Sequence, residues 1–417
     1  MQAVLISIGD ELLIGQTINT NASWMGRFLN ENGVDVVQII TIKDNEKAIV
    51  DALDKAQQLA PIILITGGLG PTKDDITKLT LAKYFKSKLI RSPAAYENVK
   101  TIFERFNRPL LEINERQADV PEDCIVVINP NGTAPGMIFE KEKTAIAAMP
   151  GVPHEMRYIM KEGVIPLIKR KFKANPILHE TLLTSGLGES FLAEKIKHIE
   201  ESLPEDISIA YLPSTGCIKI RLSTYISHNS DASTTLKKWL DKIAVEAGSA
   251  LVSKKDELLV QFIQETMISK KFTLALAESC TGGALSSIIT SISDCSSYFK
   301  GGIIAYDNSV KIEQLKVKLA TIEKHGAVSS EVATKMAESI RKKLKSTHSI
   351  AITGTAGPTG GTDLKPIGTV FISVSDENQI ITKKFQFGKT RELNIERTTI
   401  VALDMLRRFV AGTLKED

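Results

Sequence analysis

Two short apolar runs in this sequence lead through paired glycines into helix-like patterns. Ile62–Thr66 is closed by Gly67-Gly68, and Phe272–Ala277 is followed by a turn that contains Gly282-Gly283. A buried strand that passes through a glycine turn into a helix is the building unit of sheets with parallel strands. The chain is therefore expected to form α/β domains, in which helices cover both faces of a mostly parallel sheet.

The spacing of apolar residues predicts the elements of the first segment. Strand-like and helix-like patterns alternate along it, which is the β-α-β-α-β order of a parallel sheet. The expected elements are the strand Ala3–Ile8, a loop at Gly9–Gly15, the helix Asn21–Asn32 ended by Gly33, the strand Val34–Ile42, the helix Asn45–Gln58 with Asp44 as its N-cap, and the strand Ile62–Thr66.

The remaining chain divides into a small module and a second α/β segment. The small α+β module has predicted strands at 208–212 and 217–224 and a helix at 233–247. The α/β segment has predicted helices at 256–268, 284–293, 330–344 and 391–409, and predicted strands at 272–277, 302–306, 349–353, 369–373 and 380–387. A length of 417 residues leaves room for two or three domains. We place them at 1–172, 173–253 and 254–417.

Composition excludes several classes of protein. A formal net charge of +3 is too small to indicate a nucleic-acid-binding surface. Cys124, Cys217, Cys280 and Cys295 stand far apart, which favours a reducing compartment over a disulfide framework or a zinc site. The amino terminus has no signal-peptide pattern, and no apolar run approaches the ~18 residues of a membrane span. We expect a cytoplasmic protein that binds neither nucleic acid nor membrane.

The turn after Phe272–Ala277 carries a hydroxyl and a thiol at the edge where open α/β sheets bind ligands. Ser279 can act there as a nucleophile, and the backbone N–H groups of Gly282 and Gly283 can hold an anion or an oxyanion. Thr281 completes the expected substrate contacts of this turn. The alternative is a plain strand-to-helix turn with Ser279 as the N-cap. Cys280 is the rival nucleophile, because thiols attack amides readily.

A serine nucleophile needs a base, and no histidine stands close to Ser279 in the sequence. Tyr306 and Lys311 offer another solution, because a desolvated lysine can accept a proton and a tyrosine can relay one. The alternative is that Tyr306 is a half-buried strand end and that Lys311 is solvated.

A second glycine-rich loop follows another apolar strand. Its many backbone donors suit a phosphate or a ribose, although a flexible hairpin would have the same composition. The residues that we expect to contact substrate there are Gly354, Thr355, Ala356 and Gly357. Arg391 and Arg397 at the start of the last helix could clamp a phosphate, or could simply be solvated.

The amino-terminal glycine turn also suits a phosphate, because it leads into a predicted helix start. The expected phosphate-binding residues are Gly67, Gly68, Gly70 and Thr72. Asp74 and Asp75 could hold a hard cation that bridges phosphate oxygens. The alternative is an acidic helix N-terminus, where aspartate is favoured without any metal.

Five ordered motifs in the last segment strongly resemble the carboxy-terminal domain of the CinA (competence/damage-inducible) family. They stand at Ala277–Gly283, Tyr306–Lys311, His325–Ser329, Gly354–Gly361 and Pro366–Val370. In that family the domain is a nicotinamide mononucleotide deamidase, which also occurs as a stand-alone enzyme. The resemblance implies hydrolysis of the nicotinamide amide to nicotinic acid mononucleotide and ammonia, with no metal or other cofactor.

The resemblance also assigns roles to residues. It makes Ser279 the nucleophile and Tyr306 and Lys311 its activating partners. The family often has Gly-Asp-Arg before the last helix, where this chain has Lys389-Thr390-Arg391. Arg391 therefore remains the expected phosphate or catalytic contact, without the neighbouring aspartate.

The first segment resembles the amino-terminal domain of the same family, which shares the fold of molybdopterin-binding proteins. The matching stretches are Ile8–Gly15, Asn19–Asn21, Gly67–Asp75, Asn131–Gly136 and Pro150–Pro153. The resemblance implies ADP-ribose pyrophosphatase activity with a divalent metal, and optionally K+, as cofactor. Lys73 stands where the family commonly has histidine.

The middle segment resembles the family's small KH-like domain. Its run Ser185–Ser190 holds a Gly-x-Gly rather than the Gly-x-x-Gly clamp used on RNA. This favours a spacer or dimerisation element, which could reach the amino-terminal site through Glu189.

Three functions from different classes stay open. The first is a homodimeric hydrolase of pyridine-nucleotide salvage that acts on nicotinamide mononucleotide and ADP-ribose. The second is a non-catalytic competence or DNA-damage interaction protein, and the third is a molybdopterin-binding enzyme by analogy of fold. The presence of Ser279, Tyr306 and Lys311 and the near-neutral charge favour the first.

Overall fold

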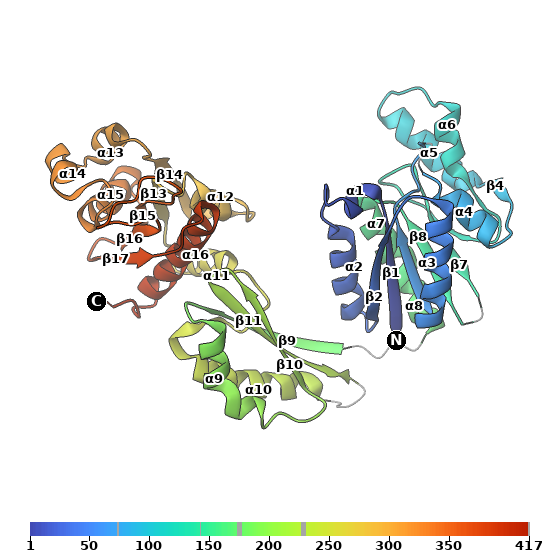
Figure 1. Cartoon of the computed structure of the whole chain (residues 1–417), viewed down its shortest axis with the longest axis horizontal. Helices are drawn as coiled ribbons and strands as arrows, with labels where there is room; N and C mark the ends of the chain where they lie inside the picture. Colours follow the sequence, from blue (N-terminus) through green and yellow to red (C-terminus); the bar gives the residue numbers. More distant parts are fainter. Residues whose placement is uncertain (73–74, 142, 173–176, 227–230, 416–417) are drawn as a thin grey trace. The chain divides into compact units, whose positions relative to one another are not determined.

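The chain folds into two compact units in a computed structural model. The structure describes residues 1–72, 75–141, 143–172, 177–226 and 231–415. The first unit is formed by residues 1–178 and the short segment 225–230, and the second by residues 179–224 and 231–417 (Figure 1). No helix in the described part of the chain is long and apolar enough to cross a membrane.

The first unit is built on a mixed sheet with the strand order β2-β1-β3-β8-β7-β6 (Figure 1). The strands β2, β1, β3 and β8 are parallel, and β7 and β6 are antiparallel additions at one edge. The elements of this unit are β1 (Gln2–Ile8), α1 (Asp10–Leu13), α2 (Thr20–Glu31), β2 (Asp35–Ile42), α3 (Glu46–Leu59), β3 (Ile62–Thr66), α4 (Thr77–Tyr84), β4 (Leu89–Arg91), α5 (Pro93–Arg105), α6 (Glu112–Glu115), β5 (Asp119–Pro121), β6 (Ile125–Val127), β7 (Gly136–Glu140), β8 (Ala145–Met149), α7 (Pro153–Ile159) and α8 (Ile165–Lys171).

Both faces of this sheet bury apolar side chains, as the alternating order predicted. On one face α2 contributes Met25 and Leu29, which pack in a cluster with residues of α7 and α8. On the other face Ile49 and Leu53 of α3 pack in a second cluster with Leu81 of α4. The mostly parallel, three-layer α/β prediction is confirmed for this unit.

Local predictions in the first unit needed three corrections. Asp44 is not the N-cap of α3, because the Asn45 side chain accepts the capping hydrogen bond from the amide of Ala48. The stretch Gly9–Gly15 contains the short helix α1 instead of being entirely loop. The glycine turn after β3 does not open a helix at once, since α4 begins only at Thr77.

The second unit begins with a small antiparallel sheet of order β10-β11-β9-β12. The helices α9 and α10 run beside it (Figure 1). The predicted strands at 208–212 and 217–224 and the helix at 233–247 are present, whereas β9 and α9 were not predicted. The elements are β9 (Ile177–Ser185), α9 (Glu189–Glu200), β10 (Ser208–Ser214), β11 (Cys217–Tyr225), α10 (Ala232–Ala247) and β12 (Leu251–Ser253).

The rest of the second unit is a mixed sheet of order β14-β13-β15-β16-β17. The strands β14, β13 and β15 are parallel, and β16 and β17 are antiparallel to their neighbours. The elements are α11 (Leu259–Ser269), β13 (Leu274–Glu278), α12 (Ala284–Thr290), β14 (Phe299–Ile304), α13 (Asn308–Leu315), α14 (Leu319–His325), α15 (Ser330–Leu344), β15 (His348–Gly354), β16 (Thr369–Ser375), β17 (Ile380–Gln386) and α16 (Arg391–Val410).

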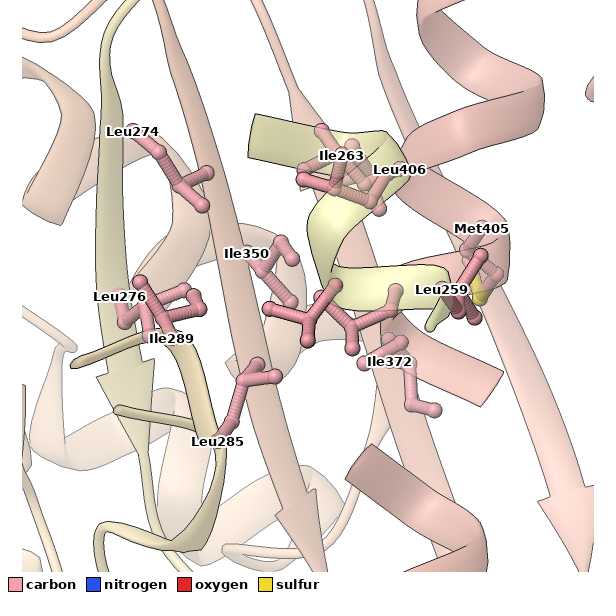
Figure 2. Packing of buried hydrophobic residues seen from close by; sticks show 14 of the residues in the cluster. Leu259, Ile263, Leu274, Leu276, Leu285, Ile289, Ile350, Ile372, Met405 and Leu406 are labelled. Carbon is pink, nitrogen blue, oxygen red and sulfur yellow. The ribbon is translucent and has the colours of Figure 1, made fainter. Parts of the chain in front are cut away.

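Helices cover both faces of this sheet as well. Figure 2 shows the cluster formed with α11, α12 and α16, whose labelled members are Leu259, Ile263, Leu274, Leu276, Leu285, Ile289, Ile350, Ile372, Met405 and Leu406. On the opposite face, Met336 and Ile340 of α15 pack with Ala275, Ala277 and Ala351. This packing holds α12 and α16 against one face of the sheet.

Candidate active site

The candidate active site lies where three parallel strands of the second unit end side by side. β13 pairs with β14 on one side and with β15 on the other, and Glu278 at its end is aligned with Ile304 and Ile352. The loops that contain Ser279, Tyr306 and Thr355 therefore leave the same edge of the sheet. This is the edge at which α/β sheets bind ligands.

Ser279 is the first residue after β13 and is 8% exposed. The turn folds back on it, because the amide of Gly282 donates to its carbonyl oxygen at 3.0 Å. Gly282 and Gly283 have φ angles of 61° and 100°, which side chains rarely adopt. A Cβ at Gly283 would also lie 2.9 Å from Cδ1 of Ile304. The two glycines thus have a local structural reason to stand here.

The side-chain carboxylate of Glu278 caps the start of α12, the helix that follows this turn. Glu278 is 1% exposed, and its Oε2 accepts hydrogen bonds from the Thr281 hydroxyl and from the amides of Gly283 and Leu285 at 2.7–3.1 Å. Its Oε1 accepts from the amide and hydroxyl of Ser286 at 2.8 and 2.6 Å. The helix terminus stabilises this buried negative charge.

This arrangement corrects the expectation that the Gly282-Gly283 turn offers free donors to an anion. The amide of Gly282 is bound to Ser279, and that of Gly283 is bound to Glu278. The Thr281 hydroxyl is likewise committed to Glu278. Sequence reasoning missed Glu278, although an acidic residue just before a helix start is a recognisable signal for such a cap.

Lys311 is 2% exposed, so the alternative of a solvated lysine is wrong. Asp307 caps α13 by accepting from the amide of Ser309 at 2.8 Å, which starts the helix in whose first turns Lys311 lies. The Nζ of Lys311 donates to the carbonyl oxygens of Ala305 at 2.7 Å and Tyr306 at 3.0 Å. Burial lowers the pKa of Lys311 below its ordinary value of 10.5, against smaller opposing effects of Asp307 and Cys280.

Arg391 connects the loops on either side of Ser279. Its Nη1 donates to the carbonyl oxygen of Gly357 at 2.9 Å, and its Nη2 donates to the hydroxyl of Tyr306 at 3.2 Å. Tyr306 lies two residues beyond β14 and is 58% exposed, so it is not a half-buried strand end. The structure thus brings Tyr306, Arg391 and the second glycine-rich loop together.

The glycine-rich loop is an ordered continuation of the sheet rather than an isolated hairpin. Thr355 pairs through its backbone with Thr369 and Gly368 at 2.8 and 2.7 Å. Asn394, which is 1% exposed, donates from Nδ2 to the carbonyl oxygens of Ala356 and Gly388 at 2.9 Å. Asn394 was not predicted, since one buried amide on a helix carries no distinctive spacing.

Two further predicted residues have different surroundings. Arg397 is exposed, and its guanidinium reaches toward Gly388 rather than into the loop that Arg391 binds. The Cys280 thiol is buried in the apolar cluster under α12. Burial raises the pKa of Cys280 to about 12, which disfavours the thiolate that a cysteine nucleophile requires.

In the first unit, Gly67 and Gly68 form a tight turn directly after β3. Their φ angles are 110° and 65°. A Cβ at Gly67 would lie 2.3 Å from the carbonyl oxygen of Ile8, and one at Gly68 would lie 2.2 Å from Oγ1 of Thr77. These close approaches are a sufficient reason for glycine at both positions, whether or not the turn also binds a phosphate.

Of the two predicted metal ligands, Asp74 lies outside the described residues, as does the neighbouring Lys73. Asp75 closes its own loop, since its Oδ2 accepts from the amide of Thr72 at 2.9 Å and from the Thr72 hydroxyl at 2.5 Å. Gly70 packs against the same carboxylate. Among the described residues, no group of three or more His, Cys, Asp or Glu side chains is placed to hold a metal ion.

A polar cluster at the same edge of the first sheet was not predicted. Asn129 is fully buried and donates to the carboxylate of Glu155 at 2.6 Å. Burial raises the pKa of Glu155, with the hydrogen bond from Asn129 opposing the shift. Nearby in the fold, Asn21 donates to the carbonyl oxygen of Gly151 at 2.6 Å, and Thr66 donates to that of Pro150 at 3.0 Å.

Three family models match successive parts of the chain. The model described as CinA C-terminal domain matches residues 256–410, and the one described as probable molybdopterin binding domain matches residues 4–170. The model described as damage-inducible protein CinA KH domain matches residues 179–251. Together they account for the two large α/β domains and the small domain between them.

Relatives with similar names match over nearly the whole chain. A CinA-like protein of Flavobacterium psychrophilum is 40% identical over 412 residues, which are 98% of this chain and 99% of that protein. A CinA-like protein of Salinibacter ruber is 38% identical over 99% of this chain and 100% of its own length. A crystal structure of competence damage-inducible protein A from Klebsiella pneumoniae is 29% identical, covers 37% of this chain and 97% of its own, and has a TM-score of 0.36.

Proposed function

The chain belongs to the CinA family, and from this premise we propose that its carboxy-terminal domain, residues 254–417, deamidates nicotinamide mononucleotide. The products are nicotinic acid mononucleotide and ammonia. Ser279 is the proposed nucleophile and Lys311 the proposed base. The proposed boundaries of the two preceding domains are 1–172 and 173–253.

The observation that carries this proposal is the way in which Lys311 is held. A neutral lysine amine has two N–H groups and one lone pair. The carbonyl oxygens of Ala305 and Tyr306 take both N–H groups, which leaves the lone pair free to accept a proton. Burial favours this neutral form, and no carboxylate among the described residues forms an ion pair with the amine. A lysine that served structure alone would be expected to pair with a carboxylate.

The proposed reaction has two stages. Ser279 Oγ attacks the amide carbon while its proton passes to Lys311 Nζ, and the C–N bond then breaks as the nitrogen takes that proton and leaves as ammonia. Water hydrolyses the resulting ester, which releases the carboxylic acid and restores the Ser279 hydroxyl. The backbone amide of Thr281, which makes no hydrogen bond with other described residues, is the proposed oxyanion donor.

The substrate phosphate and ribose are assigned to the other side of the same edge. Arg391 uses two N–H groups on Gly357 and Tyr306, which fixes the plane of its guanidinium and leaves further donors for a phosphate. The glycine-rich loop held by Asn394 supplies backbone contacts. Tyr306 is thus proposed to orient Arg391 and to line the substrate site. Arg397 stays a more distant candidate contact.

The test is ammonia release from nicotinamide mononucleotide without added metal, measured for the native chain and for Ser279→Ala. We expect a fall of at least about 10³-fold in kcat for the variant. Ser291→Ala is the matched control, because Ser291 is an exposed serine at the other end of α12 whose hydroxyl donates to the Ile288 carbonyl. It should keep native activity. No release from the native chain would favour the non-catalytic interaction protein instead.

For the amino-terminal domain we propose binding of a phosphate-bearing nucleotide at the turn of Gly67, Gly68, Gly70 and Thr72. Its fit to the molybdopterin-binding domain model and the hydrogen bond between the buried Asn129 and Glu155 at the same edge support a polar ligand site. Hydrolysis of ADP-ribose there follows from family resemblance. No step is assigned to a metal, because the Asp75 carboxylate is engaged within its own loop.

A further inference from the structure

A cavity of about 200 Å³ lies in the second unit, between the small antiparallel sheet and the helices of the carboxy-terminal domain. The small sheet contributes Leu183 and Cys217, and the segment entering α11 contributes Glu257 and Leu258. Ile288 of α12 and Ile400 of α16 complete the wall. The cavity lies beside the start of α11, at Leu259 and Val260, and beside α16 from Glu396 to Leu403.

The size and lining of this cavity suit a small ligand with an apolar body. Most of the lining side chains are aliphatic, and an apolar cavity of about 150 Å³ is enough to hold a benzene ring. The side chain of Leu258 is 54% exposed although it forms part of the wall. A bound ring would cover apolar surface that is otherwise in contact with water.

One polar group in the wall is left without a partner. Glu257 is 7% exposed, and its Oε1 is buried with no hydrogen-bond partner among the described residues. A buried carboxylate oxygen without a donor costs about 1–3 kcal/mol or more, so native proteins rarely keep one without a use. A ligand that donates a hydrogen bond would satisfy it.

The other ionisable groups of the wall do not compete for this role. Lys219 forms its ion pair with Asp256, not with Glu257. Burial raises the pKa of the Cys217 thiol, so that it stays neutral and supplies no negative charge. Glu396 stands exposed on α16 and adds a second carboxylate to the wall. The cavity therefore combines apolar side chains with two carboxylates, of which Glu257 is the buried one.

We propose that this cavity binds a small organic ammonium compound, with an apolar body about the size of an aromatic ring and one cationic N–H donor bound to Glu257. This site is separate from the proposed deamidase site and does not depend on that activity. Recognition of the ligand rests on its shape, on apolar contact and on one charge-assisted hydrogen bond.

The test uses the full chain with its isoleucine δ1 methyl groups labelled for NMR, and benzylamine as the probe. Saturable shifts of the Ile288 and Ile400 methyl signals are expected, while phenylacetate, of the same shape but opposite charge, should leave them unmoved. Glu257→Gln should weaken benzylamine binding by about tenfold, the loss of one hydrogen bond to a charged group. Absence of saturable shifts at these methyls would overturn the proposal.

Glu396→Gln is the matched control, because it removes the same charge from an exposed position of the same wall. It should change the benzylamine affinity by less than about twofold. Equal weakening by both substitutions would refute a specific role of Glu257 and would indicate only diffuse attraction of cations. The melting temperature and methyl spectrum of Glu257→Gln without ligand establish that this variant is folded.

Discussion

Two adjacent residues, Ser279 and Cys280, carry nucleophilic atoms but lie in different environments. Ser279 lies at the open end of β13, whereas the Cys280 thiol packs among apolar side chains with its pKa raised to about 12. We predict that Cys280→Ala keeps the ammonia-releasing activity within about threefold, with a loss of about 1 kcal/mol in unfolding free energy from the smaller side chain. A loss of activity as large as that of Ser279→Ala would reverse the assignment of the nucleophile.

Lys311 makes the proposed activity depend on pH in a defined direction. Only the neutral amine can accept the Ser279 proton, so kcat/KM should rise with pH through the pKa of Lys311. Because burial lowers that pKa, the rise should be centred below 10.5. Lys311→Met should lose about 10²–10⁴-fold in kcat, and its residual activity should lack this rise. A native profile that is flat from neutral to alkaline pH would contradict Lys311 as the base.

At the residue scale, the sequence predicted the chemical groups of the site better than their surroundings. The motif placed Ser279, Tyr306 and Lys311 near strand ends, and the sheet register brings these ends together. It could not predict that Lys311 is buried, since that depends on the Ala305 and Tyr306 carbonyl groups turning toward its amine. The role of Glu278 likewise depends on the fold, because α12 brings three backbone amides to its carboxylate.

At the scale of elements, α12 depends on the carboxylate that caps it. Glu278 accepts five hydrogen bonds, three of them from backbone amides at the helix start. Glu278→Gln removes the charge and places an amide NH₂ against donors, so we predict a loss of about 2 kcal/mol in unfolding free energy. Urea denaturation measures it. Glu392→Gln, at an exposed acidic position in the first turn of α16, should change stability by less than about 0.5 kcal/mol.

Most element types followed from periodicity, but several boundaries did not. The helix α15 was predicted at its observed bounds because Val332, Met336, Ile340 and Leu344 repeat on one face. The structure adds Ser329 as its N-cap. The start of α11 lies three residues later than predicted, since Leu258 remains extended and the Gln261 side chain bonds to its amide. α9 was missed because its apolar residues are spread among charged ones, and β9 because its apolar and polar residues do not alternate.

At the scale of the whole molecule, α16 joins two domains of the second unit. Near its start, Arg391 and Asn394 hold the glycine-rich loop. Near its end, the buried Arg407 donates to the carbonyl oxygens of Leu251 and Ser249 at 2.8 and 3.0 Å and pairs with Asp404. The small domain therefore contacts the same helix that positions the proposed phosphate contact.

Because Arg407 contacts the small domain, replacing it should lower the free energy of unfolding more in the full chain than in a fragment without that domain. Arg407→Met should destabilise the full chain by about 3 kcal/mol, because it leaves Asp404 and two carbonyl groups without this partner. In a fragment of residues 254–417 the carbonyl partners are absent, so the loss should be clearly smaller. Thermal and urea denaturation of the four proteins give the coupling. Equal losses in both backgrounds would show that the Ser249 and Leu251 contacts contribute nothing.

The length of α16 gives this connection a mechanical meaning. Its 20 residues form a rod about 30 Å long, and a tilt of about 5° at one end of such a rod moves the other end by about 2–3 Å. Misplacement of a reacting group by about 1 Å is enough to cost a large factor in rate. The position of the Arg391 guanidinium therefore depends on how firmly the contacts of Arg407 hold the other end of α16. A force on the small domain would therefore shift Arg391 and change the rate of the proposed deamidation.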